Sequence, residues 1–474
     1  MEEILEKFLN IEKKNDLYRD SIDGINYWVY ARFDIWQNVI LSSIFSLGKV
    51  HNAPTTSLGW KITTLAGLIK KTVFAINKKV EQADICIINH PRRVLKDGYY
   101  ECIYTDRLAE YYENNIVLEY PCMMTHMEPV KTKNIFYMDY VLLKKIFYIR
   151  FCKYVLKKEY ARLCTEIRRK IETPVKEMEQ AFQIQINIEQ VCLIIIEKIL
   201  YYKASVKSTE RIIDKINPKI VVEVVSYEID CMIINEICKR KRISVIELQH
   251  GILNNHIAYS YLTDVPVLQL PDKIFLFSDF WKTMVHCPIS SENLVATGFP
   301  YFECQRENAR KISLFDDGKI NIIFISQGTI GEKLSKLAIQ LSQILGEKYR
   351  ILFKLHPGEV AIWKEAYPWL KNGEIVVIED KKYSLYDYLL TCQIQVGVYS
   401  TALYEGLGFE LDTYIYEIEL SSYMREVCNE GYAQYVRNAQ ELYECINNYS
   451  KNKNLTREFW KNDALKNMIS CIDV

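Results

Sequence analysis

Short apolar segments alternate with amphipathic helical segments over most of this chain, and this alternation limits the fold more than any other feature. Each apolar segment is bounded by charged or polar residues, as a buried strand would be. The predicted strands are 83–90, 114–121, 218–226, 243–249, 273–278, 294–299, 320–326, 349–356, 374–379, 394–400 and 413–418. Strands that alternate with helices indicate parallel sheets built from βαβ units. The predicted fold class is therefore α/β.

The alternation is interrupted by a polar segment, 303–319, that has no apolar periodicity and is interpreted as a linker between two domains. Two consecutive doubly wound, Rossmann-like parallel-sheet domains facing a cleft are the simplest interpretation. Because ligands of such sheets bind at the carboxyl ends of the strands, the cleft is the predicted site. The predicted units are a first domain (1–305), with helical insertions at about 1–80 and 135–215, a second domain (318–450), and a C-terminal helix (451–474) that returns to the first domain.

The 60 Lys and Arg residues balance 60 Asp and Glu residues, which excludes a general nucleic-acid binder with a strongly basic surface. The balance conceals two opposite segments. Residues 131–220 contain 19 basic and 10 acidic residues, a net charge of +9, whereas residues 370–450 contain 5 and 13, a net charge of −8. The acidic segment belongs to the second domain, so phosphate binding there must depend on local N–H groups and individual side chains.

The basic segment contains a helical stretch, 135–170, with an apolar stripe of Tyr140, Leu143, Phe147, Phe151 and Tyr154 beside Arg150, Lys153 and Lys157. One interpretation is that the stripe packs against the core while the cations face water. The other is that it lies on an anionic inner membrane surface, where a lipid-linked acceptor would be found.

The N-terminus lacks the basic, apolar and small-residue regions of a signal peptide, and no window approaches the length of a membrane-spanning helix. The 14 cysteines include no CxxC pair, so no zinc site is predicted, and reduced thiols in a cytoplasmic protein are expected. We predict a cytoplasmic protein, with the inner face of the plasma membrane as the alternative location. Neither a metal site nor a cofactor is predicted.

Polar groups follow several predicted strands of the second domain directly. They are Gln327, Gly328 and Thr329, then Lys354, His356 and Pro357, then Ser400 and Thr401, with Glu405 one helical turn later. Pro357 suits the first turn of a helix, so a phosphate could bind the free N–H groups there with His356 as an added donor. An ordinary His-Pro turn is the alternative for that motif.

The other two groups have similar pairs of interpretations. Ser400 or Thr401 can cap a helix and offer hydroxyls to a phosphate, and Glu405 can accept hydrogen bonds from ribose hydroxyls. A plain N-cap is the alternative. Gly328 permits close approach of the backbone to a phosphate, although the Lys-Ser/Thr pair of a P-loop is missing.

In the first domain, Gln249 and His250 stand at the end of the strand 243–249. A histidine there is suited to act as general base or phosphate ligand, and a hydrogen-bonded structural histidine is the alternative. After the strand 83–90, Arg92 and Arg93 could hold an anionic acceptor or only solvate a loop. Asp97, followed by a glycine, is either a catalytic carboxylate or part of a turn.

Five short motifs occur in a characteristic order. They are LQHG (248–251), TGFPYFE (297–303), SQG (326–328), KLHPGE (354–359) and YSTALYEG (399–406). Their order resembles that of bacterial surface-polysaccharide glycosyltransferases of the GT-B fold, most closely capsule polysaccharide biosynthesis proteins. Sialyltransferases, polysialyltransferases and CDP-glycerol glycerophosphotransferases are more distantly similar. The resemblance covers about 83–420 and is sharpest over 247–408.

The resemblance implies roles for individual residues. In the sialyltransferase-like families the His-Pro and later Ser motifs bind the phosphate and base–ribose parts of the nucleotide, which corresponds here to His356, Pro357, Ser400 and Thr401. An acidic-Gly motif supplies the general base, which Asp97 matches, with a lysine where the family has a second acid. The glycerophosphotransferases use both their His-Gly and His-Pro histidines, which supports catalytic roles for His250 and His356.

The resemblance also implies an activity. A GT-B enzyme without a metal would transfer a sugar from a nucleotide-activated donor, CMP- or CDP-linked, to a surface polysaccharide or lipid-linked glycan. Asp97 or His250 would deprotonate the acceptor, which Arg92, Arg93 and Gln249 would bind. A UDP-sugar 2-epimerase-like enzyme and a non-catalytic polysaccharide-assembly subunit are the alternatives.

Overall fold

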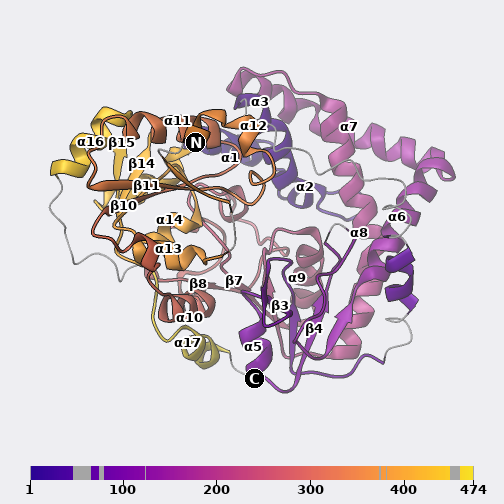
Figure 1. The fold of residues 1–474 in the computed structure, drawn as a ribbon. Helices are drawn as coiled ribbons and strands as arrows, with labels where there is room; N and C mark the ends of the chain where they lie inside the picture. Colours follow the sequence, from indigo (N-terminus) through magenta and orange to yellow (C-terminus); the bar gives the residue numbers. More distant parts are fainter. Residues whose placement is uncertain are drawn as a thin grey trace.

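The computed structural model describes residues 2–45, 64, 66–73, 79–122, 124–372, 375–379, 382–448 and 459–472. The second domain lies at the left of Figure 1 and the first domain at the right. None of the helices in the described ranges combines the length and apolar character that crossing a membrane would require.

Seven strands form the sheet of the first domain, in the order β5-β4-β1-β6-β7-β8-β9, and each neighbouring pair is parallel. Their bounds are Ile85–Ile88 (β1), Asn115–Glu119 (β4), Ile135–Tyr137 (β5), Ile220–Val224 (β6), Ser244–Leu248 (β7), Lys273–Leu276 (β8) and Leu294–Ala296 (β9). The chain builds outward from β1 to one edge and then from β6 to the other. The topological switch point therefore lies between β1 and β6.

The second domain has a six-stranded sheet, also parallel throughout, in the order β12-β11-β10-β13-β14-β15. Its strands are Ile320–Ile325 (β10), Tyr349–Lys354 (β11), Val376–Ile378 (β12), Ile394–Gly397 (β13), Asp412–Tyr416 (β14) and Gln434–Val436 (β15). Its switch point lies between β10 and β13. The predicted α/β class, with two Rossmann-like doubly wound parallel sheets, is confirmed.

Four strands were not predicted. β5 and β15 are three-residue edge strands, too short to give an apolar pattern. Arg93–Lys96 (β2) and Tyr99–Cys102 (β3) form an antiparallel hairpin outside the main sheets. The hairpin strands are four residues long and mix apolar with charged side chains, so they lack the continuous apolar segment that identifies a buried strand.

The helices of the first domain are Glu2–Lys14 (α1), Tyr27–Ile35 (α2), Ser42–Ile44 (α3), Asp106–Tyr111 (α5), Asp139–Tyr154 (α6), Lys157–Phe182 (α7), Ile188–Ile216 (α8), Ile229–Lys241 (α9) and Pro300–Asn308 (α10), with a π-helical turn, Trp36–Leu41, between α2 and α3. The helical insertion expected at about 1–80 is present in its described part, and residues 46–63 lie outside the described ranges. α10 corrects the interpretation of 303–319 as a linker, because its first six residues complete this helix.

The second domain and the C-terminus contribute Gly331–Ser342 (α11), Trp363–Ala366 (α12), Leu385–Thr391 (α13), Thr401–Leu407 (α14), Arg425–Asn429 (α15), Ala439–Asn448 (α16) and Ala464–Cys471 (α17). α17 lies beside α5 and α10 of the first domain (Figure 1). Gly298 makes this contact possible, because a Cβ at that position would stand 2.4 Å from the carbonyl oxygen of Lys461. Residues 451–458 lie outside the described ranges.

The two domains share an apolar core. One continuous cluster of buried side chains includes Phe277 and Trp281 of the first domain and Leu403 and Tyr404 of the second. The rings of Trp281 and Tyr404 are 4.6 Å apart between centroids. This shared core fixes how the carboxyl ends of the two sheets face each other.

Candidate functional site

The carboxyl ends of the two sheets meet at Gly251 and Thr401. A Cβ at Gly251, in the loop after β7, would lie 3.6 Å from the Thr401 Oγ1 at the start of α14. Nearby, Asn254 of the first domain donates a hydrogen bond to the carbonyl oxygen of Tyr423 in the second, at 3.4 Å. We refer to this junction as the interdomain site.

His250 stands immediately before the glycine at this junction. Its Nε2 is 3.2 Å from the hydroxyl of Tyr227, and its Nδ1 is buried without a hydrogen-bond partner in the described part of the chain. If Tyr227 donates to Nε2, Nδ1 carries the proton; if Nε2 donates to Tyr227, the Nδ1 lone pair is free. In the second tautomer the imidazole can accept a proton from a bound hydroxyl group.

Three histidines around this point are held neutral. Burial, with a smaller contribution from neighbouring cations and histidines, lowers the pKa of His250 to about 3. Burial and the charge of Arg92 lower the pKa of His90 to about 4, and burial and Arg32 lower that of His256 to about 4. A neutral imidazole is a base or a hydrogen-bonding group at pH 7, so these histidines contribute no positive charge for a phosphate.

Arg92 is linked to the junction through Tyr104. Its Nη1 donates to the Tyr104 hydroxyl at 3.1 Å, and that hydroxyl donates to the carbonyl oxygen of His250 at 2.9 Å. Burial alone would lower the pKa of Arg92, but Tyr104 and Glu405 raise it above its ordinary value. The negative charge of Glu405, in the second domain, therefore favours the charged form of Arg92.

Glu405 itself is buried in α14 and accepts a hydrogen bond from the Tyr386 hydroxyl at 3.1 Å. Burial raises its pKa, and the charge of Arg92 partly offsets that effect. To bind a ribose, as predicted, this carboxylate would have to be accessible to a ligand, but in the structure it is buried. Glu405 is thus better placed to orient Arg92 and Tyr386.

The predicted nucleotide-binding residues of the second domain lie around the switch point between β10 and β13. The Ser400 hydroxyl caps α14 by accepting a hydrogen bond from the Ala402 N–H at 3.2 Å. Thr329, after β10, lies 2.6 Å from the hydroxyl of Tyr399, after β13. The Gln327 Oε1 is buried and has no hydrogen-bond partner among the described residues. These groups line the edge that faces the first domain.

The prediction that a helix begins at Pro357 is wrong. Residues 357–362 form turns, and the four-residue α12 begins only at Trp363. His356 is exposed, and its Nδ1 accepts a hydrogen bond from the Gly358 N–H at 3.2 Å. The His-Pro motif therefore offers a side chain and a turn at the end of β11, but no helix N-terminus.

The buried carboxylate of Glu359 explains this local structure. It accepts hydrogen bonds from the His356 N–H at 2.7 Å, the Ser326 hydroxyl at 3.0 Å and the Tyr367 hydroxyl at 2.6 Å. A Cβ at Gly331, the first residue of α11, would lie 2.0 Å from the Glu359 Oε1. This carboxylate therefore occupies the N-terminus of α11 and leaves only the other side of the His356 turn exposed.

Two other predicted residues stand near that turn. Lys354, the last residue of β11, is half-buried, and its Nζ is 3.4 Å from the carbonyl oxygen of Leu355. Gly328 is exposed, and a Cβ there would meet nothing within 4 Å, so the space beside this residue is open.

Three predicted residues are not part of the interdomain site. Asp97 is exposed at the tip of the β2–β3 hairpin, where it and Gly98 have the positive φ angles, 50° and 81°, of a tight hairpin turn. Gln249 is buried: its Nε2 donates to the carbonyl of Gly251 at 2.9 Å, and its Oε1 accepts from the Phe277 N–H at 2.8 Å. Its amide therefore joins two strand ends and is not available to an acceptor.

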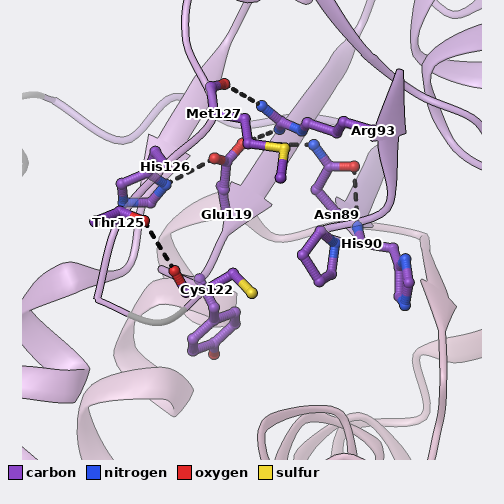
Figure 2. A pocket seen from close by; sticks show the side chains of 10 residues that line it. Asn89, His90, Arg93, Glu119, Cys122, Thr125, His126 and Met127 are labelled. Atoms are coloured by element: carbon purple, nitrogen blue, oxygen red, sulfur yellow. Dashed lines mark hydrogen bonds and ion pairs between the residues drawn. The ribbon is translucent and has the colours of Figure 1, made fainter. Parts of the chain in front are cut away.

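Arg93 is the third. It pairs with the buried carboxylate of Glu119, which also accepts a hydrogen bond from His126 at 2.7 Å. Figure 2 shows these three side chains beside a cavity of about 120 Å³ that His90 also lines. Since its charge is neutralised inside the protein, Arg93 is unsuited to hold an anionic acceptor, unlike its neighbour Arg92.

Sequence reasoning missed several residues of the site. His250 was identified by the rule that functional residues follow the carboxyl ends of parallel strands, which we call the strand-end rule. His90 follows β1 and Tyr227 follows β6, so both residues also obey it. Tyr104 lies outside any strand and no sequence signal marks it. Glu359 stands inside the KLHPGE motif, but its role depends on contacts outside the motif, with Tyr367 eight residues later and with Ser326, which is distant in sequence.

A pair of buried carboxyl groups lies beneath the interdomain site. Glu223 of β6 and Glu247 of β7 are direct neighbours in the sheet. Glu247 accepts hydrogen bonds from the Tyr259 hydroxyl at 2.6 Å and the Ser226 N–H at 3.0 Å. Burial and the charge of Glu247 raise the pKa of Glu223 to about 8. At neutral pH Glu223 is therefore protonated, because two adjacent buried carboxylates would repel each other.

This pair predicts a pH-dependent stability. A carboxyl group whose pKa is raised in the folded state stabilises the fold fully below its unfolded pKa and loses that contribution as pH rises through about 8. We expect the free energy of unfolding to fall by about 2–4 kcal/mol between pH 5 and pH 9, and Glu223→Gln to remove most of this fall. Urea unfolding at both pH values measures it. The exposed Glu307→Gln variant is the control, and an unchanged slope in Glu223→Gln would contradict the assignment.

No family model and no curated protein matches this sequence. Several solved structures are similar to this chain. One is UDP-GlcNAc 2-epimerase from Neisseria meningitidis bound to UDP-GlcNAc, which has 10% sequence identity and a TM-score of 0.47. The match covers 82% of this chain and 98% of the epimerase chain. The wall teichoic acid polymerase TagF has 9% identity, coverages of 86% and 89%, and a TM-score of 0.41. The spinosyn rhamnosyltransferase SpnG has 8% identity, coverages of 76% and 88%, and a TM-score of 0.40. Similarity at this level concerns the fold alone.

Proposed function

We propose that this protein is a metal-independent GT-B glycosyltransferase that transfers a sugar from a nucleotide-activated donor, CMP- or CDP-linked, to a growing surface polysaccharide or lipid-linked glycan. The observation that carries the proposal is the junction of Gly251 and Thr401. It brings a neutral histidine with a free ring nitrogen next to hydroxyl and N–H donors from the switch point of the second sheet. The proposal includes a cytoplasmic location, with the acceptor met at the inner face of the plasma membrane.

The donor nucleotide would bind the second domain. Ser400, Thr401 and Thr329 provide hydroxyls at the switch point, and the unpartnered Gln327 Oε1 provides an acceptor for an N–H or O–H group. Lys354, His356 and Pro357 stand at the neighbouring strand end. In the transfer step, negative charge grows on the leaving phosphate, so cations and donors at this edge stabilise the transition state.

The acceptor would bind the first domain. In the tautomer with a free Nδ1 lone pair, His250 can take up the proton of the acceptor hydroxyl, with Tyr227 fixing the orientation of the ring. Arg92 faces the same space and can hold an anionic group of either substrate. Asp97 and Gln249, at a hairpin tip and in the core respectively, are left out of this assignment.

A thermal-shift panel of CMP, CDP, UDP and GDP tests the donor site. We expect a cytidine nucleotide to raise the melting temperature, because a ligand at 100 times its Kd stabilises the native state by about 2.7 kcal/mol. Thr401→Val should abolish most of the shift, and Thr165→Val, at an exposed position of α7, should not. The absence of a shift with all four nucleotides would contradict a nucleotide site.

A second measurement separates transfer from epimerisation. The purified protein is incubated with nucleotide sugars in the absence of any acceptor, and the sugar is analysed. An epimerised sugar would contradict the transferase proposal and support the 2-epimerase alternative. Transfer activity retained in a folded His356→Ala variant would remove His356 from the donor site without affecting the assignment of His250.

A further inference from the structure

The end of α6 and the start of α7 present an unusual combination of exposed apolar and basic side chains. Five large apolar residues are exposed in this stretch: Phe147 (64%), Phe151 (49%), Tyr154 (64%), Val155 (63%) and Leu156 (40%). Phe147, Phe151 and Tyr154 follow at i, i+4 and i+7 and thus share one face of α6. We call these five residues the apolar edge. Scattered exposed apolar residues are ordinary, but a contiguous set of this kind marks an interaction surface.

The apolar edge is not the face by which α6 joins the domain. Val141 and Cys152 are buried in the core, and Tyr148 and Ile149 pack against it from the neighbouring positions. Of the stripe predicted to pack inward, only its first part, including the buried Leu143, faces the domain. Of the two interpretations of the stripe, packing on the core therefore holds only for its first part, and α6 is apolar on two faces.

The charge around the apolar edge is of one sign. Residues 140–158 contain six Lys and Arg residues and no Asp or Glu. Arg150, Lys153, Lys157 and Lys158 are exposed and make no ion pair with a described residue. The first carboxylate after Asp139 is Glu159, which is already paired with Arg162 at 2.6 Å. On the side toward the core, Glu197 and Asp34 act on Lys145, whereas these four outward cations are left for an anionic partner by the described residues.

The position of the edge suits a large planar partner. α6 and the beginning of α7 lie at the right-hand border of the molecule in Figure 1, away from the second domain at the left. A partner that binds the apolar edge therefore does not cover the interdomain site. Aromatic and aliphatic side chains surrounded by Lys and Arg are the composition that inserts into the interface of an anionic bilayer.

We infer that the apolar edge docks on the surface of an anionic lipid bilayer. Phe147, Phe151 and the Val155–Leu156 turn enter the headgroup–acyl boundary, and the surrounding cations contact the lipid phosphates. The inference adds to the proposed function the surface by which the protein reaches an acceptor at the membrane. It depends on the proposed function only for the identity of that acceptor, because vesicle binding is measured without any substrate.

Vesicle flotation tests the inference with the full chain. Vesicles of phosphatidylcholine alone are compared with vesicles that contain roughly one third phosphatidylglycerol. We expect flotation only with the anionic vesicles, and we expect added salt to weaken it. Phe147→Ser with Phe151→Ser, and separately Lys153→Glu with Lys157→Glu, should each reduce binding roughly tenfold or more. Lys319→Glu with Lys348→Glu, an equal charge change on the exposed surface of the second domain, should leave binding unchanged.

A fluorescent variant distinguishes insertion from adhesion. The chain has seven tryptophans of its own, so the emission of Phe151→Trp is compared with that of the wild type under the same conditions. The difference, which reports the introduced indole, should shift to the blue on anionic vesicles and should be quenched by lipids that carry a spin label near the headgroup. Binding that both double variants leave unchanged, or an introduced indole that no lipid quenches, would overturn the inference. A wild type that binds no vesicle but self-associates until Phe147 and Phe151 are replaced would overturn it in favour of a second copy of this chain. Loss of nucleotide binding, in contrast, would contradict only the proposed function.

Discussion

Replacing His250 by Asn is expected to lower kcat for sugar transfer by about 100- to 10,000-fold while the protein keeps its fold and its nucleotide binding. The Nδ1 of His250 has no hydrogen-bond partner among the described residues, and an Asn amide can occupy its position. That amide forms hydrogen bonds but cannot take up a proton at neutral pH. A fall in kcat in this variant would therefore show that His250 takes up the proton of the acceptor hydroxyl. The measurement is steady-state transfer, together with the thermal shift caused by the nucleotide.

His286→Asn is the matched control, because His286 is exposed and has no place in the interdomain site. The pH profile adds an independent readout. Since burial lowers the pKa of His250 to about 3, the base stays neutral down to mildly acidic pH. We expect kcat/KM to show no fall centred near pH 6.5, where an ordinary histidine would become protonated. A His250→Asn variant with more than about a third of the wild-type rate would remove this residue as the base.

The strand-end rule accounts for most of the site that the sequence predicted. His250, Ser400 and Thr401 follow buried parallel strands, and the carboxyl ends of such strands meet at one edge of a sheet. These residues could be predicted because the rule needs only local sequence: the apolar segment and the polar residue that follows it are contiguous in the chain. The same rule, applied to β1 and β6, would have found His90 and Tyr227.

The failures have different physical causes, and only one of them is a partner distant in sequence. Arg93 has the same local context as Arg92, but Glu119 neutralises it inside the fold. Pro357 would suit a helix start, but Glu359 binds the backbone of this turn and holds it in another conformation. Asp97 is different: its hairpin turn is local, and the turn interpretation was open from the Asp-Gly pair alone.

The N-terminal helices depend on one buried ion pair, and this dependence gives the largest stability effect that we expect. Glu12 of α1 and Arg32 of α2 are 0% and 1% exposed and form two hydrogen bonds of 2.8 Å. Arg32 also donates to the carbonyl oxygens of Ile257 at 2.7 Å and Ser260 at 3.0 Å. These carbonyls lie in the segment after β7 that carries His256, so the pair attaches α1 and α2 to the loop of the interdomain site.

Glu12→Ala is expected to lower the free energy of unfolding by about 3–5 kcal/mol, because it leaves the buried guanidinium of Arg32 without a counter-ion. Urea unfolding measures the loss. Glu172→Ala, which removes an exposed ion pair with Lys176 at 2.8 Å, should cost less than about 1 kcal/mol. Replacing both partners, as in Glu12→Met with Arg32→Met, should recover much of the loss, since no unpaired charge then remains in the core. A loss below about 1 kcal/mol in Glu12→Ala would mean that Arg32 finds water there, and that the N-terminal helices are held by their apolar contacts instead.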